Sequence, residues 1–392
     1  MLDSSGGREA VFYPAASHGR IKENIYLLRS LRLCGEYVME FMRRYTKVAM
    51  WIIVIAGLLS SVLTANGEAT VTIKPRVQEI PSYAGFPEID ATRNRFLILG
   101  DTQRTSHWEF WRERNNKERK LILDEIAKRQ PAFVVFLGDL TTRGSSIKHW
   151  QEFDDLHREW REKEIPHLPI LGNHDLYGNN QEALDNYFRR FPHLERRRWY
   201  SLIWKGIGLI FVDSNFSILT AEENEQQKRW YVDELERFER DKKIDFVIVC
   251  SHEPPFTNSR VVGPNKEVEV DFTNPFLRSS KTSFFFSGHA HTYERFQVGN
   301  KIFIVSGGGG GPRHKVYSDS NKRRYEDLFS GPELRFFHAC EIKMTDEALI
   351  YSILRLEPDE TFNTIDPITL ERQGKNKGEK DCSIKDEGIG YL

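Results

Sequence analysis

Short apolar runs that end in glycine or a polar residue recur along the central part of the chain. From residue 94 to 172 they alternate with charged stretches whose apolar positions recur at helical spacing, and from residue 199 to 356 apolar runs predominate. This order predicts a layered α/β fold, with strands and helices alternating first and mostly strands afterwards. Residues 199–214 are expected to form a hairpin that turns at Lys205-Gly206. The other expected strands are 95–100, 132–138, 167–172, 244–250, 283–288, 301–310, 336–344 and 348–356. The expected helices are 108–129, 147–161 and 222–241.

One apolar segment differs from the others in its length and in its flanks. Residues 48–65 carry no charge, and Arg43, Arg44 and Lys47 come just before them. A basic flank before an apolar run is shared by signal peptides and signal anchors, and this run is long for the first and short for the second. Residues 48–66 are therefore either a signal peptide or a transmembrane signal anchor that holds the protein in a membrane.

The expected division of the chain follows from this segment. Residues 1–47 are a cytoplasmic segment, or a mis-assigned start if translation begins at Met42, and residues 67–93 are a linker. Residues 94–356 form one large domain, and residues 357–392 are a polar C-terminal tail. Because the basic flank stays inside, the bulk of the chain crosses the membrane. We expect an exported protein, which is membrane-anchored with its large domain outside the cytoplasm, or periplasmic or secreted after cleavage.

Composition narrows the classes of function. The 56 Lys and Arg residues nearly balance the 57 Asp and Glu residues, whereas nucleic-acid-binding domains are usually clearly basic, so we expect no nucleic-acid partner. The 4 cysteines are scattered, without a CxxC pair, which argues against a disulfide scaffold. Cys250 and Cys340 lie in apolar runs and are expected to be small buried hydrophobic residues.

Five polar motifs each come directly after an expected strand. Side chains at the carboxyl ends of strands gather at one edge of an α/β sheet, and a preceding glycine allows a sharp turn. Two carboxylates, one amide oxygen and three imidazoles suit Mn, Fe or Zn better than Ca, and they exceed what one tetrahedral ion needs. We therefore expect two ions that share a bridging carboxylate. The motifs are Gly100-Asp101-Thr102-Gln103, Gly138-Asp139, Gly172-Asn173-His174-Asp175, Ser251-His252 and Gly288-His289-Ala290-His291.

Each motif alone has an ordinary structural explanation. Gly-Asp pairs are common in turns, a single histidine such as His252 is more often structural, and residues 173–175 also fit a helix cap. His289 and His291 are more specific, because alternate residues of an extended segment point the same way. The occurrence of all five motifs at strand ends favours the metal site.

This series of motifs resembles the metallophosphoesterase superfamily, also called calcineurin-like phosphoesterases, over about residues 94–310. The family pattern reads D-x-H, G-D, G-N-H-D or E, H and G-H-x-H. Residues 251–255 and 289–295 are similar to the purple acid phosphatase branch of the family. The resemblance implies a four-layer α/β fold of two packed mixed β-sheets flanked by helices, and it makes residues 94–356 a calcineurin-like phosphoesterase domain.

The resemblance also implies a role for each motif residue. The cofactors would be two divalent or mixed-valence transition-metal ions, Mn, Fe or Zn, bridged by Asp139. His174 would contact the phosphate of the substrate, and Asp175 would orient the His174 ring. The first ion would be held by Asp101, Asp139 and His291, and the second by Asp139, Asn173, His252 and His289.

Two positions depart from the family pattern. Gln103 stands where the D-x-H motif has histidine, and its carbonyl oxygen is a weaker ligand than imidazole for these metals, so we expect Gln103 to make the first metal position the weaker one. Thr142 stands where purple acid phosphatases carry the tyrosine of G-D-x-x-Y. Without that tyrosine we expect no tyrosinate colour, which makes the chain a relative of these enzymes only.

The function implied by the resemblance is metal-dependent hydrolysis of phosphate esters by a metal-bridging hydroxide, with a phosphorylated substrate as partner. We expect a phosphomonoesterase, and a phosphodiesterase with the same site is the alternative, because loops such as 104–116, 178–198 and 256–280 set the substrate. A non-catalytic metal-binding surface protein is the alternative from another class. Gln103 favours it, whereas the intact series from Asn173 to Asp175 argues against it.

Overall fold

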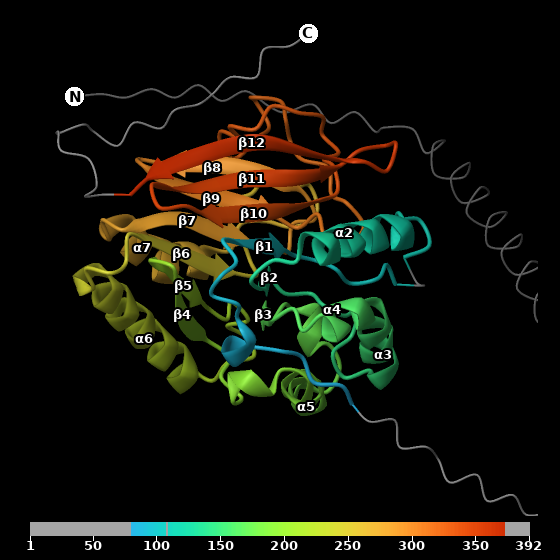
Figure 1. Ribbon diagram of the computed structural model, residues 1–392. Coiled ribbons are helices and arrows are strands. Elements are labelled where there is room, and N and C mark those ends of the chain that lie inside the picture. The colour runs from blue at the N-terminus through green and yellow to red at the C-terminus, as the bar shows by residue number, and fades with distance from the viewer. Residues whose placement is uncertain (1–79, 107–108, 373–392) are drawn as a thin grey trace, which may run out of the picture. The chain divides into compact units, whose positions relative to one another are not determined.

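The structure is a computed structural model that describes residues 80–106 and 109–372, all within one unit that spans Glu79–Leu392. Two six-stranded mixed sheets form its centre (Figure 1). In the first sheet the strand order is β12-β11-β10-β1-β2-β3, and β1, β2 and β3 are parallel. Its strands are β1 (Arg95–Leu99), β2 (Val134–Phe136), β3 (His167–Pro169), β10 (His338–Met344), β11 (Ala348–Leu356) and β12 (Phe362–Glu371).

The second sheet has the order β4-β5-β6-β7-β9-β8. Four of its strands, β5, β6, β7 and β9, are parallel, and an antiparallel strand lies at each edge. The hairpin that was predicted to turn at Lys205-Gly206 is formed by β4 and β5. The strands are β4 (Tyr200–Trp204), β5 (Ile207–Phe211), β6 (Phe246–Ser251), β7 (Thr282–Ser287), β8 (Tyr293–Val298) and β9 (Lys301–Ser306).

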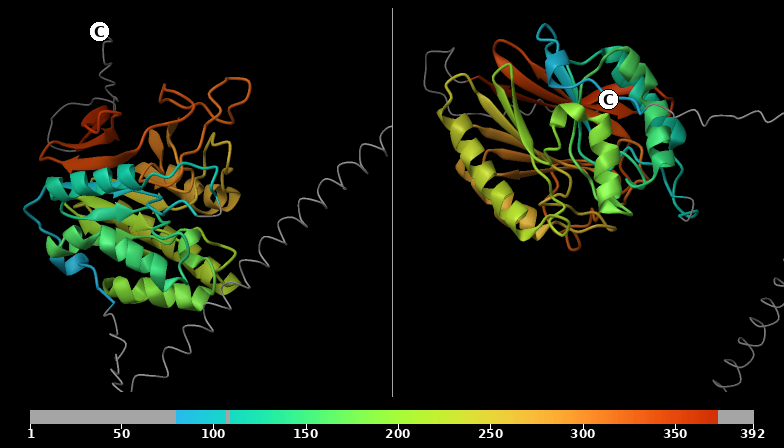
Figure 2. Two further views of the ribbon diagram at one scale, coloured as in Figure 1. Left: turned by 90° about the vertical axis from the view of Figure 1, so that its right-hand side faces the viewer. Right: turned by 90° about the horizontal axis from the view of Figure 1, so that it is seen from below.

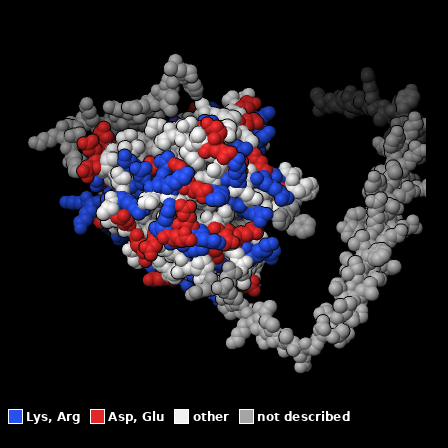
Figure 3. All heavy atoms as spheres, turned by 45° about the vertical axis from the view of Figure 1, so that its right-hand side comes forward, with Lys and Arg blue, Asp and Glu red and all other residues white. Residues whose placement is uncertain are grey.

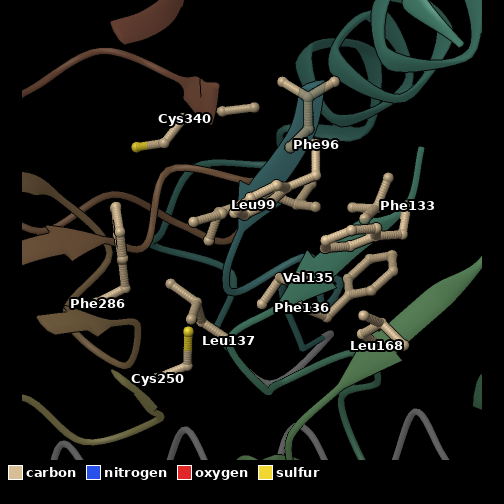
Figure 4. Packing of buried hydrophobic residues seen from close by; sticks show 14 of the residues in the cluster. Phe96, Leu99, Phe133, Val135, Phe136, Leu137, Leu168, Cys250, Phe286 and Cys340 are labelled. Carbon is tan, nitrogen blue, oxygen red and sulfur yellow. The ribbon is translucent and has the colours of Figure 1, made fainter. Parts of the chain in front are cut away.

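The two sheets pack face to face through one apolar core. Along β7, Phe284 and Phe286 join the core shared with the first sheet, whereas Phe285 joins the core under the helices. Because successive side chains of a strand point to opposite faces, a continuous apolar run is what a strand buried on both faces requires. Figure 4 shows Phe286 and Cys250 near Leu137 in this core. The buried positions of Cys250 and Cys340 confirm the interpretation of both as small hydrophobic residues.

Helices cover the outer face of each sheet, which completes the predicted four layers (Figure 2). Apolar side chains of α6 and α7 pack on the second sheet, and those of α2, α3 and α4 pack on the first. The α-helices are α2 (Asn116–Arg129), α3 (Ile147–Leu156), α4 (Arg158–Glu162), α5 (Asn180–Arg190), α6 (Ala221–Arg240) and α7 (Asn274–Arg278). Shorter helical turns are η1 (Phe86–Glu88), η2 (His174–Leu176), η3 (Pro192–Leu194) and η4 (Val268–Thr273).

The long helix α6 illustrates how sequence determines an element here. The Thr220 hydroxyl accepts a hydrogen bond from the amide of Glu223 at 3.1 Å, and the Glu223 carboxylate accepts one from the amide of Thr220 at 2.8 Å. This reciprocal capping box satisfies two amides that the first helical turn leaves without partners. Tyr231, Leu235 and Phe238 then recur at helical spacing and bury one face of α6 against the second sheet.

Charged side chains of both signs are interspersed on the face that Figure 3 presents. On α2, ion pairs one helical turn apart join Lys120 to Asp124 at 2.7 Å and Arg129 to Glu125 at 2.9 Å. Helical ion pairs of this kind contribute only a few tenths of a kcal/mol each, about 0.3–0.5 kcal/mol. The fold therefore depends on its apolar cores far more than on these ion pairs.

The predicted helix 108–129 is wrong in its first part. The helix α2 begins only at Asn116, and Trp111, which was assigned to its apolar face, is 70% exposed. Residues 109–115 form turns and irregular structure instead, and the Thr105 hydroxyl donates a hydrogen bond to the carbonyl of Glu113. The predicted helix 147–161 is correct in extent but is divided at His157 into α3 and α4.

The polar C-terminal tail expected from residue 357 is also wrong as far as residue 371. Strand β12 pairs antiparallel with β11 at the edge of the first sheet. Only one residue of β12, Ile368, is buried. Most positions of this edge strand can therefore be polar, and its sequence resembles that of a polar tail. Asp366 on this strand accepts a hydrogen bond from Tyr293 at 2.7 Å. Strand β8, over 293–298, was likewise not predicted.

The described part of the expected linker, residues 80–93, packs against the domain. Tyr83 is buried and donates a hydrogen bond to Asp154 at 2.9 Å. The apolar segment 48–66, residues 1–47 and the first part of the linker lie outside the described residues. Within residues 80–106 and 109–372, no helix is long and apolar enough to cross a membrane.

Candidate metal centre

The predicted site residues converge from the two sheets. In the first sheet, the parallel strands β1, β2 and β3 lead to Asp101, Asp139 and Asn173 beyond their carboxyl ends. In the second sheet, β6 leads to His252, and β7 leads to the segment 289–291. Because both sets of strands end on the same side of the core, the five motifs meet there as predicted.

The backbone at the site is strained where candidate ligands stand. Asp101, Asp139 and His289 all have positive φ, of 60°, 55° and 63°. Such conformations cost free energy in residues other than glycine and tend to occur at functional sites. Gly172 is needed for close packing, since a Cβ there would lie 2.2 Å from both the amide nitrogen and Oδ1 of Asp139.

Two groups of side chains have the spacing of a metal site, and they share one carboxylate. In each group, one potential ligand atom from every residue lies within 4.8 Å of the others. Asp139 belongs to both groups, which is the arrangement expected for a bridging ligand. The first group is Asp101, Asp139 and His291, and the second is Asp139, His252 and His289.

The histidine rings are oriented by carbonyl groups behind them. Nδ1 of His252 donates to the carbonyl of Leu137 at 2.7 Å, and Nδ1 of His291 donates to the carbonyl of Pro312 at 2.8 Å. The Nε2 atoms therefore face the site, at 3.4 Å from Asp139 Oδ1 for His252 and 3.3 Å from Asp101 Oδ1 for His291. A hydrogen bond on the far nitrogen is the usual support of a metal-binding histidine.

The amide of Asn173 lies next to the second group. Its Oδ1 is 3.0 Å from Nε2 of His252. The structure thus brings an amide oxygen, two imidazoles and the Asp139 carboxylate together, as the sequence predicted. The role of Asn173 as a ligand stays a prediction.

The residues present fit divalent transition metals. Oδ2 of Asp101 is buried and has no hydrogen-bond partner among the described residues, and the same holds for Oε1 of Gln103. Buried oxygens without a partner cost free energy unless a cation or a donor satisfies them. Mixed carboxylate and imidazole donors suit Mn, Fe or Zn, which agrees with the metals expected from the sequence.

Burial and neighbouring charged groups shift the pKa values of the residues at the site. Burial alone would raise the pKa of Asp139, but the His252, His174 and His289 imidazoles nearby hold it below its ordinary value. Burial opposes the positive charge on His252, but Asp139 and Asp101 raise its pKa above the ordinary value. Burial, together with repulsion from His252, lowers the pKa of His289 to about 3. His289 is therefore neutral near pH 7, which is the form that binds a metal ion.

His174 lies beside the second group and is held by two hydrogen bonds. Its backbone amide donates to Asp139 Oδ1 at 2.8 Å, and its ring Nδ1 donates to the carbonyl of Thr142 at 3.0 Å. The ring also meets the ring of Tyr177 edge to face, with 4.6 Å between the ring centres. Nε2 is the ring nitrogen left to contact a substrate.

The role predicted for Asp175 is wrong. Its carboxylate accepts hydrogen bonds from the backbone amides of Leu140, Thr141 and Gly172, and the His174 ring is hydrogen-bonded to the Thr142 carbonyl. Asp175 therefore ties together the loops after β2 and β3, and the Thr142 carbonyl orients His174 instead. Burial, with repulsion from Asp139, raises the pKa of Asp175 to about 7.

Gln103 occupies the predicted position at the first group. Its Nε2 donates to Asp139 Oδ2 at 3.1 Å and lies 3.1 Å from Nε2 of His291. In this conformation the amide nitrogen, which cannot bind a metal, faces the two candidate ligands. The role of Gln103 as a ligand stays a prediction.

Sequence reasoning missed His314, which supports His291 from behind. The two rings stack with 4.4 Å between their centres, and Nδ1 of His314 accepts a hydrogen bond from the amide of His291 at 3.2 Å. Burial and the nearby His291 lower the pKa of His314 far below its ordinary value, so the ring is neutral. No spacing signal links His314 to the five motifs, because it lies in an irregular segment after β9.

A family model for calcineurin-like phosphoesterases matches residues 94–293, which is more than half of the 392 residues. The chain belongs to the calcineurin-like phosphoesterase family. Purple acid phosphatase 21 of Arabidopsis thaliana is 27% identical over 234 residues, which cover 55% of this chain and 49% of that protein. The chain thus spans about half the length of this curated relative.

Two solved structures resemble the fold. Purple acid phosphatase PPD1 from yellow lupin (Lupinus luteus) seeds aligns with a TM-score of 0.56 and 17% identity, over 71% of this chain and 54% of that one. GAP50, the anchor in the inner membrane complex of Plasmodium, aligns with a TM-score of 0.54 and 18% identity, over 72% of this chain and 90% of that one. These likenesses and the two mixed sheets confirm the predicted fold class, and the match to the family model confirms the predicted superfamily.

Proposed function

We propose that this protein hydrolyses phosphate monoesters at a centre of two metal ions. The observation that carries the proposal is the pair of ligand groups that share Asp139. Family membership and the similarity to purple acid phosphatase 21 support it. The first ion would be held by Asp101, Asp139 and His291, with Gln103 beside it, and the second by Asp139, Asn173, His252 and His289.

The chain's own residues supply binding and proton transfer. Two divalent ions at such a centre provide positive charge for the phosphoryl oxygens and lower the pKa of water. In the reaction, the oxygen of water forms a bond to phosphorus and the bond from phosphorus to the alcohol oxygen breaks. The charged form of His174, with Nδ1 held by the Thr142 carbonyl, donates the Nε2 proton to the departing alcohol oxygen.

A non-catalytic surface protein with the same fold is the second candidate, and Gln103 favours it. Its amide hydrogen-bonds to Asp139 and lies against His291, so it competes with a metal ion for two candidate ligands of the first position. The oriented ring of His174 argues for catalysis, because a metal-binding scaffold needs no free imidazole nitrogen beside its ligands.

The experiment is hydrolysis of p-nitrophenyl phosphate and of bis(p-nitrophenyl) phosphate by the full chain, after removal of metals and reloading with Mn, Fe or Zn. The proposal expects metal-dependent turnover that favours the monoester. Preference for the diester would assign the chain to the phosphodiesterases. Metal binding without turnover of either compound supports the non-catalytic candidate. Asp233→Asn, on an exposed part of α6, serves as the control for variants of the site.

We also propose that the domain lies outside the cytoplasm. The basic residues at 43–47 and the uncharged run 48–65 support this location. N-terminal sequencing of protein from its own cells separates cleavage near Ala65 from an uncleaved anchor. Fractionation that finds the whole chain soluble in the cytoplasm contradicts the proposal.

A further inference from the structure

A pocket of about 400 Å³ opens beside the second ligand group. Asn173 forms part of its wall, as does Glu253, the residue that follows His252. Tyr177 also lines the pocket, and its ring touches the ring of His174. A phosphate bound between the metal positions and His174 would therefore direct its alcohol group into this pocket.

The lining of the pocket is acidic and aromatic. Glu253 and Glu267 contribute two carboxylates, and Tyr177 and Phe216 contribute aromatic rings. None of the described residues that line the pocket is Lys or Arg. Carboxylates attract a cation and repel an anion, and aromatic faces also attract cations. The pocket thus differs in charge from the metal positions, which attract the phosphate.

Contacts on the protein side hold Glu253 and Phe216 in place before any substrate arrives. The Glu253 carboxylate accepts a hydrogen bond from Asn265 Nδ2 at 2.6 Å, and its backbone amide donates to Ser214 Oγ at 2.9 Å. The ring of Phe216 stacks on the buried ring of Phe272, with 5.7 Å between the centres. A wall that is fixed in advance loses little entropy when a ligand binds.

Two lysines, Lys266 and Lys228, form ion pairs with carboxylates outside the pocket lining. Lys266, next to Glu267, pairs with Glu269 at 2.9 Å. Lys228 pairs with Glu225 at 2.7 Å and with Asp271 at 3.3 Å. Lys266 and Lys228 are therefore paired with carboxylates other than those of Glu253 and Glu267.

On the premise of the proposed function, we propose that the substrate is the phosphate monoester of an amino alcohol. The ammonium group lies in the pocket, close to the carboxylates of Glu253 and Glu267 and the rings of Tyr177 and Phe216. Water and the ester give inorganic phosphate and the amino alcohol, whose oxygen takes the proton as its bond to phosphorus breaks. No oxidant, reductant or further reactant is needed.

The test compares three esters of equal length that differ in the charge of the leaving alcohol: 2-aminoethyl, 2-hydroxyethyl and carboxymethyl phosphate. The full chain, loaded with metal, should show kcat/KM falling in that order by roughly fivefold per step, the effect of one partly exposed ion pair. Equal values or the reverse order overturn the proposal. Turnover of p-nitrophenyl phosphate in the same preparation shows that the phosphatase assignment itself stands, whereas no turnover of any of the four compounds overturns both.

The variant Glu267→Gln distinguishes the effect of the pocket on kcat/KM from the effect of the intrinsic reactivity of the esters. Reactivity is the same for both proteins, so a change in the ratio of kcat/KM for aminoethyl over hydroxyethyl phosphate reports the pocket alone. The ratio should fall by about fivefold in Glu267→Gln and should stay the same in Glu236→Gln, whose exposed carboxylate on α6 pairs with Arg240. An unchanged ratio in Glu267→Gln, or an equal fall in the control, contradicts the assignment.

Discussion

Replacing His174 by alanine tests its role in catalysis separately from metal binding, because the backbone and the ring of this residue make different contacts. The hydrogen bond to Asp139 Oδ1 comes from the backbone amide, which alanine keeps. The ring contributes the bond to the Thr142 carbonyl and the edge-to-face contact with Tyr177. His174→Ala therefore leaves every candidate ligand in place and removes only the group that faces the substrate.

The magnitudes follow from these contacts. Loss of one hydrogen bond from a half-buried ring should lower the free energy of unfolding by about 1 kcal/mol, so the variant should remain folded. Loss of one acid–base group should lower turnover by roughly 10²–10⁴, equivalent to about 3–5 kcal/mol in the activation barrier. The loss should be smaller for p-nitrophenyl phosphate than for phenyl phosphate, since the better leaving group needs less protonation.

The assay measures metal content by mass spectrometry alongside turnover of both aryl phosphates. The variant should keep the metal content of the parent protein and lose more activity on phenyl phosphate. Loss of metal in His174→Ala would mean that the ring supports the ligands, and full activity on both compounds would mean that it takes no part in proton transfer. Either result refutes the assigned role.

Three further predictions rest on other contacts. Gln103→His replaces the amide beside Asp139 and His291 with an imidazole, and calorimetric titration should find tighter binding at the weaker metal position, whereas unchanged affinities would exclude a role for Gln103 at this position. Gly172→Ala places a Cβ 2.2 Å from the Asp139 amide nitrogen, so thermal unfolding should show the melting temperature falling by several degrees, and a parent-like melting temperature would contradict this packing. Burial raises the pKa of Glu294 to about 7, above its value in the unfolded chain, so the carboxyl group disfavours folding increasingly as pH rises from about 4.5 to 7. Glu294→Gln should therefore gain stability relative to the parent between pH 5 and 8, and a difference that does not change with pH would contradict the shift.

The elements that position the site could be predicted because strands buried on both faces produce unbroken apolar runs. Asp101, Asp139 and His289 each follow such a run, and their common location at the carboxyl ends of parallel strands follows from that alone. Strand β12 could not be predicted in this way, because an edge strand with one buried residue, Ile368, has the composition of a polar tail. Trp111 was misplaced because an apolar residue at helical spacing can also lie exposed in a loop.

Within the site, ligand types could be predicted, but the groups that orient them could not. Side chains carry a sequence signal, whereas the Thr142 carbonyl that orients His174 and the backbone amides that bind Asp175 belong to every residue alike. His314 comes next to His291 only through the path of the irregular segment after β9. Such contacts can be identified only when the fold is known.

Titration of the metal-free protein with a divalent transition metal, while phosphate release from p-nitrophenyl phosphate is followed, tests the central claim most directly. Two ligand groups that share Asp139 predict that activity rises until two ions are bound per chain and then levels off. Full activity without metal would contradict the proposed centre. Saturation with two ions and no phosphate release would contradict the proposed catalysis.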